Sequence, residues 1–446
     1  MSKKLVTLWG FSLVVGLAAC GVAIFFAQQQ GLDPVRLTGD AKGYVLLAEN
    51  MYNHHVFSFS QIEPFSPDSF RAPGYPAFLA ALFAIFHNWV VVLLVQAVLV
   101  SVAPVLLYIL LRSYHERAAW WGAILFTLEP IRLFASSTLL SDSLFTCLFL
   151  GSLVLLAESA RRRSYLWIAA TGLVLGIAVL VRPIAEFLPL LYVGYLLVAR
   201  VPWRQLVLLS LILVATMVVV IAPWMARNHA LFNTWSISSV GSYNLAAYNA
   251  PEYMKYHPTP EGLQTLQDFA GRQSRLPAAE RLSLARAGEF SAVFWSVVRG
   301  HEADYAFFHI FKTIPFFLTD GLRDTVRLFG VELSSPPNIT GAVLSGKVGE
   351  LVAGLRQGGL AVGLLVAGGG FWLCVVALYL FGVYTLLRKK IYPLTFLLVG
   401  LVFYFALLTG PVSNARYRVP VEGFLLVAAA VALFELKSRW YDKASQ

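Results

Sequence analysis

The sequence predicts an all-α polytopic membrane protein with about 10 transmembrane helices, in a range of roughly 10–13. Hydrophobic residues make up 58% of the 446 residues, and charged residues make up 13%. A soluble globular domain carries about 25% charged residues, so the composition excludes that class. The apolar runs are roughly 17–25 residues long, which suits helices that cross a bilayer and exceeds the strands of a membrane barrel.

The predicted spans fall into two groups that a long polar interval separates. They lie near residues 5–27, 89–111, 118–136, 139–157, 165–181, 184–199, 206–224, 360–387, 392–408 and 419–434. Two further apolar segments, residues 75–86 and 305–318, are short for a span. We expect them to lie in the outer leaflet or dip into it, and if both cross, the number of spans rises.

Basic residues mark alternate turns between the spans and orient the chain. The positive-inside rule places these turns in the cytoplasm. They contain Lys3, Lys4, Arg112, Arg117, Arg161, Arg162, Arg163, Arg200, Arg204, Arg388, Lys389, Lys390, Lys437 and Arg439. Both termini are therefore predicted to be cytoplasmic, and the first outer loop, residues 28–88, is predicted to be outside.

This orientation divides the chain into three predicted parts. Residues 1–224 form an N-terminal transmembrane catalytic module that includes the first outer loop. Residues 225–359 form a small helical domain outside the cytoplasm, and residues 360–446 form the C-terminal transmembrane helices.

The charge and the cysteines exclude other classes. The net charge of +10 does not indicate nucleic-acid binding, because the basic residues are spread along the ends of the apolar runs. Cys20, Cys147 and Cys374 all lie inside apolar runs, so we expect neither a disulfide scaffold nor a zinc site. The sequence contains no evident metal-ligand cluster and no Walker-type nucleotide motif.

Ionisable residues gather at the predicted outer ends of the spans. A charge at this depth costs on the order of 2–3 kcal/mol, so it is usually paired or functional. One interpretation is internal ion pairing, of Glu129 with Arg132 and of Arg182 with Asp142 or Glu186. For the whole set we favour a phosphate-bearing ligand, because arginine forks match phosphate geometry. The set comprises Asp40, Arg71, Glu129, Arg132, Asp142, Arg182, Glu186, Arg227, Arg416 and Arg418.

Asp40 begins a predicted amphipathic helix, residues 40–53, whose apolar face includes Tyr44. Asp40 could be the N-cap of that helix, or it could be a general base presented beside the membrane. Arg71 and the breaker cluster Pro73-Gly74-Tyr75-Pro76 close the same loop, which fixes an arginine at the mouth of the following helix.

Further motifs follow Asp40 in a definite order along the chain. They are Asp40 with Tyr44 and Ala48, Arg71-Ala72-Pro73-Gly74-Tyr75-Pro76, Leu139-Leu140-Ser141-Asp142-Ser143-Leu144-Phe145, Val181-Arg182-Pro183, Pro223-Trp224 with Arg227-Asn228, and Asn414-Ala415-Arg416-Tyr417-Arg418-Val419-Pro420. The ordered set resembles the GT-C class of integral membrane glycosyltransferases. The branch that it resembles most contains the dolichyl-phosphate-mannose protein mannosyltransferases and the aminoarabinose transferases of lipid A.

The resemblance covers most of residues 5–434 and implies a polyprenyl-phosphate sugar donor and a glycan, lipid or protein acceptor. It implies that Asp40 is the catalytic base and that Asp142 is a second acid of the cleft. The implied ligands of the donor phosphate are Arg71, Arg182, Arg416 and Arg418, and the candidates for acceptor or sugar contacts are Tyr44, Tyr75, Arg227, Asn228 and Asn244. No cofactor is implied, although some relatives need a divalent metal.

The chain departs from this family pattern in two places. The protein mannosyltransferases carry an Asp-Glu pair in the first loop, whereas here Ala41 follows Asp40. They also contain a large β-trefoil insertion that this chain lacks. The identity of the acceptor therefore does not follow from the resemblance.

The predicted reaction is an inverting displacement at the anomeric carbon, with polyprenyl phosphate as the leaving group. The alternatives are a lipid-linked glycan polymerase, ligase or flippase, and a non-enzymatic scaffold. A flippase would need polar residues through the membrane midplane, where these spans are apolar. We expect a site on the extracytoplasmic face of a bacterial plasma membrane, with membrane lipids around it and no nucleic-acid partner.

Overall fold

The computed structural model describes residues 3–328, 349 and 359–444, and all regular elements in these ranges are helices. The predicted all-α class is therefore confirmed for this part of the chain. Most of residues 329–358, the last part of the predicted outer domain, lie outside the described residues.

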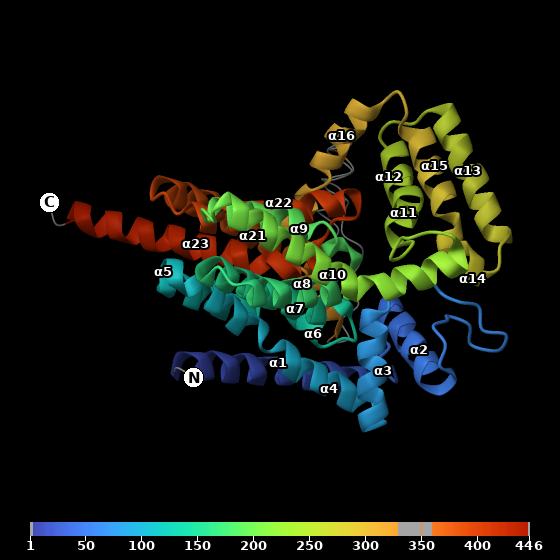
Figure 1. Ribbon diagram of the computed structural model, residues 1–446, viewed down its shortest axis with the longest axis horizontal. Coiled ribbons are helices and arrows are strands. Elements are labelled where there is room, and N and C mark those ends of the chain that lie inside the picture. The colour runs from blue at the N-terminus through green and yellow to red at the C-terminus, as the bar shows by residue number, and fades with distance from the viewer. Residues whose placement is uncertain (1–2, 329–348, 350–358, 445–446) are drawn as a thin grey trace.

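Long helices run along the length of the molecule and form a bundle (Figure 1). The bundle contains α1 (Lys3–Gln29), α4 (Trp89–Val100), α5 (Ala103–Leu128), α6 (Pro130–Ser136), α7 (Ser141–Arg162), α8 (Tyr165–Val181), α9 (Leu188–Val198), α10 (Trp203–Phe232), α21 (Gly359–Arg388), α22 (Tyr392–Thr409) and α23 (Ala415–Ala444). The start of α1 and the end of α23 lie at the same end of this bundle (Figure 1), as predicted for two termini on one side of a membrane.

Shorter helices gather at the opposite end (Figure 1). The first outer loop supplies α2 (Gly39–His54) and α3 (Gly74–Phe86), and the outer domain supplies α11 (Val240–Asn244), α12 (Ala250–Met254), α13 (Pro260–Arg275), α14 (Ala278–Arg281), α15 (Ala287–Val298) and α16 (Glu302–Phe311). Two more short helices, α17 (Ile314–Leu318) and α18 (Leu322–Leu328), pack on the bundle helix α21.

Seven helical stretches in the described residues are long and apolar enough to cross a membrane. They are Lys3–Gln29, Trp89–Leu128, Ser141–Arg162, Trp203–Phe232, Val362–Arg388, Tyr392–Val412 and Ala415–Trp440, and the shorter apolar helices are Gly74–Phe86, Tyr165–Val181 and Pro183–Val198. The polytopic class is thereby confirmed, and the total of about ten spans stays a prediction.

Two predicted spans run together in the stretch Trp89–Leu128, which has 40 residues. The backbone bends inside it at His115, where φ is −158° and ψ is 89°. The Tyr108 hydroxyl donates to Glu116 at 3.1 Å across the bend. In a straight helix those residues would be about 12 Å apart along the axis, so the bend brings the two arms together.

The two short apolar segments differ from each other. Helix α3 lies at the end of the bundle and runs across the direction of α1 (Figure 1), which fits the expected interfacial helix. The segment 305–318 is divided between α16, with 10 residues, and α17, with 5 residues. Neither helix has the length of a span.

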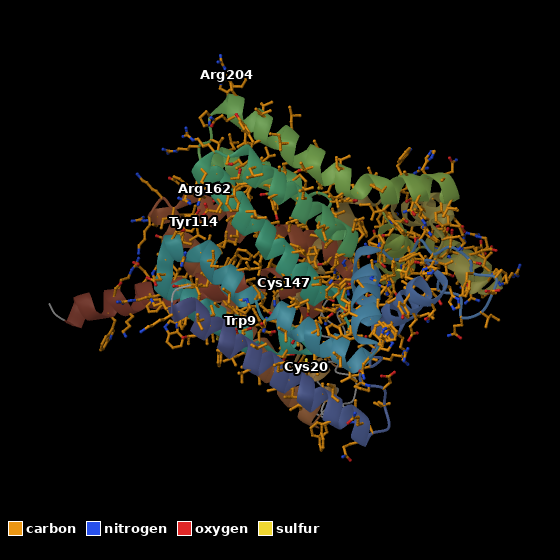
Figure 2. All side chains as sticks on the ribbon, turned by 60° about the horizontal axis from the view of Figure 1, so that its bottom comes forward. Trp9, Cys20, Tyr114, Cys147, Arg162 and Arg204 are labelled. Atoms are coloured by element: carbon orange, nitrogen blue, oxygen red, sulfur yellow. The ribbon has the colours of Figure 1, made fainter. Side chains whose placement is uncertain are left out.

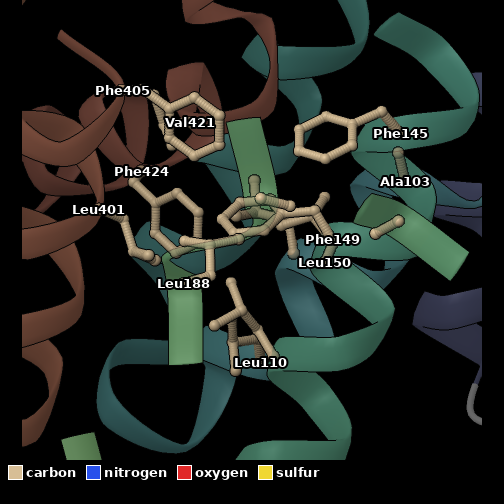
Figure 3. Packing of buried hydrophobic residues seen from close by; sticks show 14 of the residues in the cluster. Ala103, Leu110, Phe145, Phe149, Leu150, Leu188, Leu401, Phe405, Val421 and Phe424 are labelled. Atoms are coloured by element: carbon tan, nitrogen blue, oxygen red, sulfur yellow. The ribbon is translucent and has the colours of Figure 1, made fainter. Parts of the chain in front are cut away.

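Helix α23 forms the centre of the bundle, because 78% of its most apolar window is buried within the protein. Its Phe424 packs against Phe149 of α7, and Phe149 in turn packs against Phe405 of α22 (Figure 3). By contrast, only 22% of the corresponding window of α10 is buried. The other face of α10 is therefore available to lipid.

The basic turns lie at one end of the bundle, and the cysteines lie within it. Figure 2 shows Arg162 and Arg204 at the end of the molecule away from α2 and α3. It also shows Cys20 and Cys147 on different helices, and both are free thiols. This distribution keeps basic side chains at the end of the bundle where α1 begins.

Gly382 lets α21 approach α23 closely. A Cβ atom at this position would lie 2.0 Å from the Ala428 carbonyl oxygen of α23. Small residues at such contacts allow the backbones of membrane helices to pack directly.

We expect Gly382→Ala to destabilise the protein by about 1–3 kcal/mol, because the added methyl group overpacks the contact between α21 and α23. The measurement is thermal unfolding of the purified protein in detergent. Gly370→Ala in the same helix is the matched control, because a Cβ there meets nothing within 4 Å. Equal unfolding temperatures for both variants would contradict the proposed packing role of Gly382.

Candidate active site

Asp40 lies in the first turn of α2, at the end of the bundle that carries the outer domain (Figure 1). The N-cap of this helix is Thr38, whose hydroxyl accepts a hydrogen bond from the Ala41 amide at 3.1 Å. The alternative that Asp40 is the N-cap is therefore wrong. Because Thr38 fills that role, the carboxylate of Asp40 is available to other side chains.

Arg71 reaches Asp40 from the end of the same loop. Its Nη2 donates to Asp40 Oδ1 at 2.5 Å, and its Nη1 lies 3.4 Å from the Tyr44 hydroxyl. The guanidinium group also lies over the rings of Tyr44 and Phe70, at 4.9 and 5.0 Å from their centres. Two aromatic faces and one carboxylate thus fix its orientation.

Gly74, in the Pro73-Gly74-Tyr75-Pro76 cluster, helps to determine the position of Arg71. A Cβ atom at Gly74 would lie 2.7 Å from the carbonyl carbon of Leu180 in α8. The glycine therefore lets the start of α3 rest against the end of α8. That contact brings Arg71, before α3, to the same region as Arg182, after α8.

Arg416 connects the two aspartates. It lies in the first turn of α23, where its amide donates to Asn414 Oδ1 at 3.0 Å. Its Nη1 donates to Asp40 Oδ2 at 2.6 Å, and its Nη2 lies 2.8 Å from Asp142 Oδ2. One guanidinium group therefore binds carboxylates from two different elements.

Asp142 is fully buried at the start of α7. Besides Arg416, it accepts a hydrogen bond from Arg182 Nη1. Of the two partners expected for Arg182, the structure therefore shows Asp142 and not Glu186. The Arg182 guanidinium group also lies 5.7 Å from the centre of the Tyr417 ring.

These five side chains form a chain of alternating charge with a net charge of +1. Their order is Arg71, Asp40, Arg416, Asp142 and Arg182. Burial would raise the pKa of Asp40, but the charges of Arg71 and Arg416 lower it to about 2. Asp40 is therefore an ionised, strongly paired carboxylate in this structure, and it is a weak base in that state.

A cavity of about 870 Å³ opens beside this chain of charges. Asp40, Arg71, Arg182 and Arg416 line it, whereas the buried Asp142 does not. The rest of the lining has two characters. One part is apolar and includes Phe187, Met217, Ile221, Met225, Leu408 and Val412, and the other is polar and uncharged and includes Ser236, Ser238, Ser242, Asn244 and Ser291.

Of the candidates for sugar contacts, Tyr44 and Asn244 line the cavity. Tyr75 does not line it, because its ring is fully buried and its hydroxyl donates to Gln96 at 2.6 Å. Asn228 is also buried, and its side-chain amide donates to the carbonyl oxygens of Ser236 and Ile237. Asn228 thus holds the segment that carries Ser236 and Ile237 of the cavity lining.

Arg227 lies outside the cavity and supports the first outer loop. Its Nη1 donates to the Asp68 carbonyl oxygen at 2.8 Å, and its guanidinium group lies 4.5 Å from the centre of the Trp224 ring. The Asp68 carboxylate accepts a hydrogen bond from the Arg71 amide at 3.2 Å. Arg227 is therefore linked to the phosphate-binding candidates through Asp68 and not by direct contact.

Arg418 is separate from the cavity as well. It is fully buried, pairs with Glu422 at 3.0 Å and lies 3.5 Å above the Trp372 ring. Residues two apart on a helix point to nearly opposite sides, so Arg418 faces away from the cavity when Arg416 faces into it. The sequence motif that contains both arginines could not distinguish their roles.

The expected ion pair between Glu129 and Arg132 takes another form. The Glu129 carboxylate accepts a hydrogen bond from the Arg132 backbone amide at 3.1 Å and caps α6. The Arg132 guanidinium group instead donates to the Thr127 carbonyl oxygen at 3.2 Å and to Ser12 at 3.3 Å. These two residues hold helix ends together, away from the cavity.

Sequence reasoning did not identify Ser236, Ser238 or Ser291 of the cavity, and it assigned no role to Tyr417. Ser236 and Ser238 flank Ile237 in a polar–apolar alternation after Trp235, which is a signal that could have marked an edge facing a cleft. Within the described ranges, no three side chains of His, Cys, Asp or Glu gather as a metal site would require.

Comparison with known proteins finds a family match over part of the chain and a similar fold. Residues 70–226 match the family described as dolichyl-phosphate-mannose-protein mannosyltransferase. This segment includes Arg71, Asp142 and Arg182. A comparison with curated protein sequences finds no match.

The fold is similar to that of the Archaeoglobus fulgidus oligosaccharyltransferase. The apo structure of that protein gives a TM-score of 0.52 at 17% identity, over 97% of this chain and 51% of that chain. The structure with Zn and sulfate gives 0.51 at 15% identity, over 96% and 49%. A third structure, tethered to an acceptor peptide that contains the NVT sequon, gives 0.50 at 15% identity, over 96% and 50%.

This chain therefore spans about half the length of these solved structures, and at such identities the likeness concerns the fold. The family match covers the segment that carries three of the five charged residues of the site. The chain thus matches the dolichyl-phosphate-mannose-protein mannosyltransferase family over residues 70–226, and its fold is similar to that of an archaeal oligosaccharyltransferase.

Proposed function

We propose that this protein transfers a sugar from a polyprenyl-phosphate donor to an acceptor on the extracytoplasmic side of the membrane, with inversion at the anomeric carbon. The observation that supports this proposal is the row of three arginines and two aspartates beside a large cavity, which the arginines and Asp40 line. The acceptor is a glycan, a lipid or a protein.

The charge of this wall matches the proposed donor. A polyprenyl-phosphate sugar is a phosphodiester with one negative charge, and the five side chains together have a net charge of +1. Hydrogen-bond donors are also available, because Arg71 Nε is buried without a partner and Arg182 uses only Nη1 among the described contacts. Arginines in this setting stabilise the phosphate charge that grows as the sugar leaves.

The apolar wall suits the polyprenyl chain. Met217, Ile221 and Met225 lie on α10, and Leu408 belongs to α22. A prenyl chain on this wall would bury its hydrocarbon surface against these side chains.

The two ends of the bundle support the proposed orientation of the cavity. Arg162 and Arg204, from two of the basic turns, lie at the end away from α2 and α3 (Figure 2). With these turns in the cytoplasm, the cavity faces the other side of the membrane.

Asp40 is proposed to take the proton of the acceptor hydroxyl, or to orient that hydroxyl. The acceptor oxygen then bonds to the anomeric carbon, the bond from that carbon to the phosphate oxygen breaks, and polyprenyl phosphate leaves with the electron pair. In the structure both Asp40 oxygens accept from arginines. The donor phosphate would draw Arg71 and Arg416 away, and burial would then raise the proton affinity of Asp40.

Asp142 is proposed to be a positioning residue. It is fully buried and does not line the cavity, but it binds both Arg416 and Arg182. It would hold these two cations at a fixed spacing for the phosphate.

We expect Asp40→Asn to lower the transfer rate by about 10²–10⁴-fold, because the amide cannot accept the proton. The measurement is release of polyprenyl phosphate from a short-chain polyprenyl-phosphate sugar by the lipid-reconstituted protein. Asp33→Asn is the matched control, since Asp33 lies in the same loop and pairs with Arg36. Equal rates for wild type and Asp40→Asn would remove Asp40 from the chemistry.

We expect Arg416→Lys to lower kcat/KM for the donor by at least about 10-fold, because an ammonium group cannot bind Asp40 and Asp142 in the same planar, forked geometry. The same transfer assay gives this value. Arg204→Lys, at an exposed position in a basic turn, should behave as wild type. Full activity of Arg416→Lys would show that the site needs only a positive charge at this position.

The pH dependence distinguishes the free protein from its donor complex. The pKa of Asp40 is about 2, below its ordinary value, so the carboxylate stays ionised until the pH falls toward 2. We therefore expect no loss of kcat/KM from Asp40 above about pH 4. If the donor phosphate draws Arg71 and Arg416 away from Asp40, kcat falls at a higher pH than kcat/KM does. If kcat and kcat/KM instead fall at the same acidic pH, the arginines do not move from Asp40 to the donor.

A further inference from the structure

Glu186 is the second acid of the cavity. Among the residues that line it, the carboxylates are those of Asp40 and Glu186. Asp40 is paired with two arginines, whereas the Glu186 side chain has no hydrogen bond or ion pair with any residue that the structure describes. Its nearest arginine in the sequence, Arg182, is bound to Asp142.

The segment that presents Glu186 is held firmly. It follows a short 3-10 turn, Pro183–Ala185, and the Glu186 amide donates to the Pro183 carbonyl oxygen at 2.9 Å. The Tyr404 hydroxyl of α22 donates to the Ile184 carbonyl oxygen. The carboxylate is thus presented by an anchored turn between α8 and α9, and not by a free loop.

Glu186 is an exposed residue, so a solvated carboxylate is the simplest alternative, and the apolar lining around it is what distinguishes its position from an ordinary surface. The lining next to it in the sequence is Ile184 and Phe187, and Met217 and Ile221 of α10 belong to the same cavity. A charge beside such an apolar wall, at the edge of a membrane, is usually paired or functional. Here the protein supplies no partner within the described residues.

The chemistry of the cavity restricts what the missing partner can be. A phosphate would be repelled by a carboxylate and fits the arginine wall instead. The remaining polar lining, Ser236, Ser238, Ser242, Asn244 and Ser291, is uncharged and suits hydroxyl groups. A carboxylate forms strong hydrogen bonds with hydroxyl donors, since one partner is charged.

We infer that Glu186 binds a hydroxyl group of a sugar substrate and thereby helps to select that sugar. This inference rests on the proposed function, because it assumes that a sugar enters the cavity. A donor sugar and an acceptor glycan both carry hydroxyl groups, so the experiment must separate the two.

The test compares Glu186→Ala and Glu186→Gln with wild type in lipid-reconstituted transfer assays. Donor concentration is varied in one arm with short-chain polyprenyl-phosphate hexoses, and acceptor concentration in the other. We expect Glu186→Ala to raise one of the two KM values by about 10–100-fold with a smaller change in kcat, and Glu186→Gln to raise it less. The arm in which KM rises identifies the sugar that Glu186 contacts.

Glu261→Gln is the matched control, because Glu261 is an exposed acid at the start of α13, outside the cavity. Thermal unfolding in detergent confirms that each variant is folded. Unchanged KM values in both arms would overturn the inference. A fall in kcat alone, with loss of one limb of the pH profile, would also overturn it and assign proton transfer to Glu186.

Failure of the proposed function gives a different result. Wild-type protein would then transfer no sugar from any donor of the panel. Equilibrium binding of the same donors and of soluble sugar acceptors still tests Glu186 in that case. A weaker Kd for Glu186→Ala than for wild type supports the contact, and equal Kd values for every ligand overturn it.

Discussion

The hydrogen bonds of Arg416 are the interaction on which the site depends. This one guanidinium group binds Asp40, 376 residues away in sequence, and Asp142, 274 residues away. It therefore joins the first outer loop, α7 and α23 at one point. Because Asp142 is fully buried, its charge would be costly without Arg416 and Arg182. The cavity wall exists only when these elements have docked.

The same helix uses a second arginine for a different purpose. Arg418 lies two residues after Arg416 and turns into the bundle, where Glu422, Trp372 and the Phe316 carbonyl oxygen surround it. Arg416 lines the cavity, whereas Arg418 joins α17 and α21 to α23. The position of the charged side of the cavity relative to the core of the bundle is thereby set within a single turn of α23.

The sequence by itself determined the class of the protein and most members of the charged wall. Long apolar runs predict helices in a membrane because no other regular structure satisfies the backbone there. Arg71, Arg182, Asp142 and Arg416 were identified because ionisable groups at the ends of apolar runs are expensive and need a partner. The helix after Asp40 was predicted over residues 40–53 and is observed over Gly39–His54.

Only the tertiary structure decided which residues meet. Arg71 and Asp40 pair because Gly74 lets α3 rest on α8, a contact that no local pattern shows. Arg418, Tyr75 and Arg227 share motifs with cavity residues, yet their partners lie elsewhere. Glu186 was assigned a possible pairing with Arg182, and only the packing of α7 gives that arginine to Asp142. The physical reason is that a sequence records the chemistry of each side chain, whereas partners depend on helix faces and close approaches that form when the bundle packs.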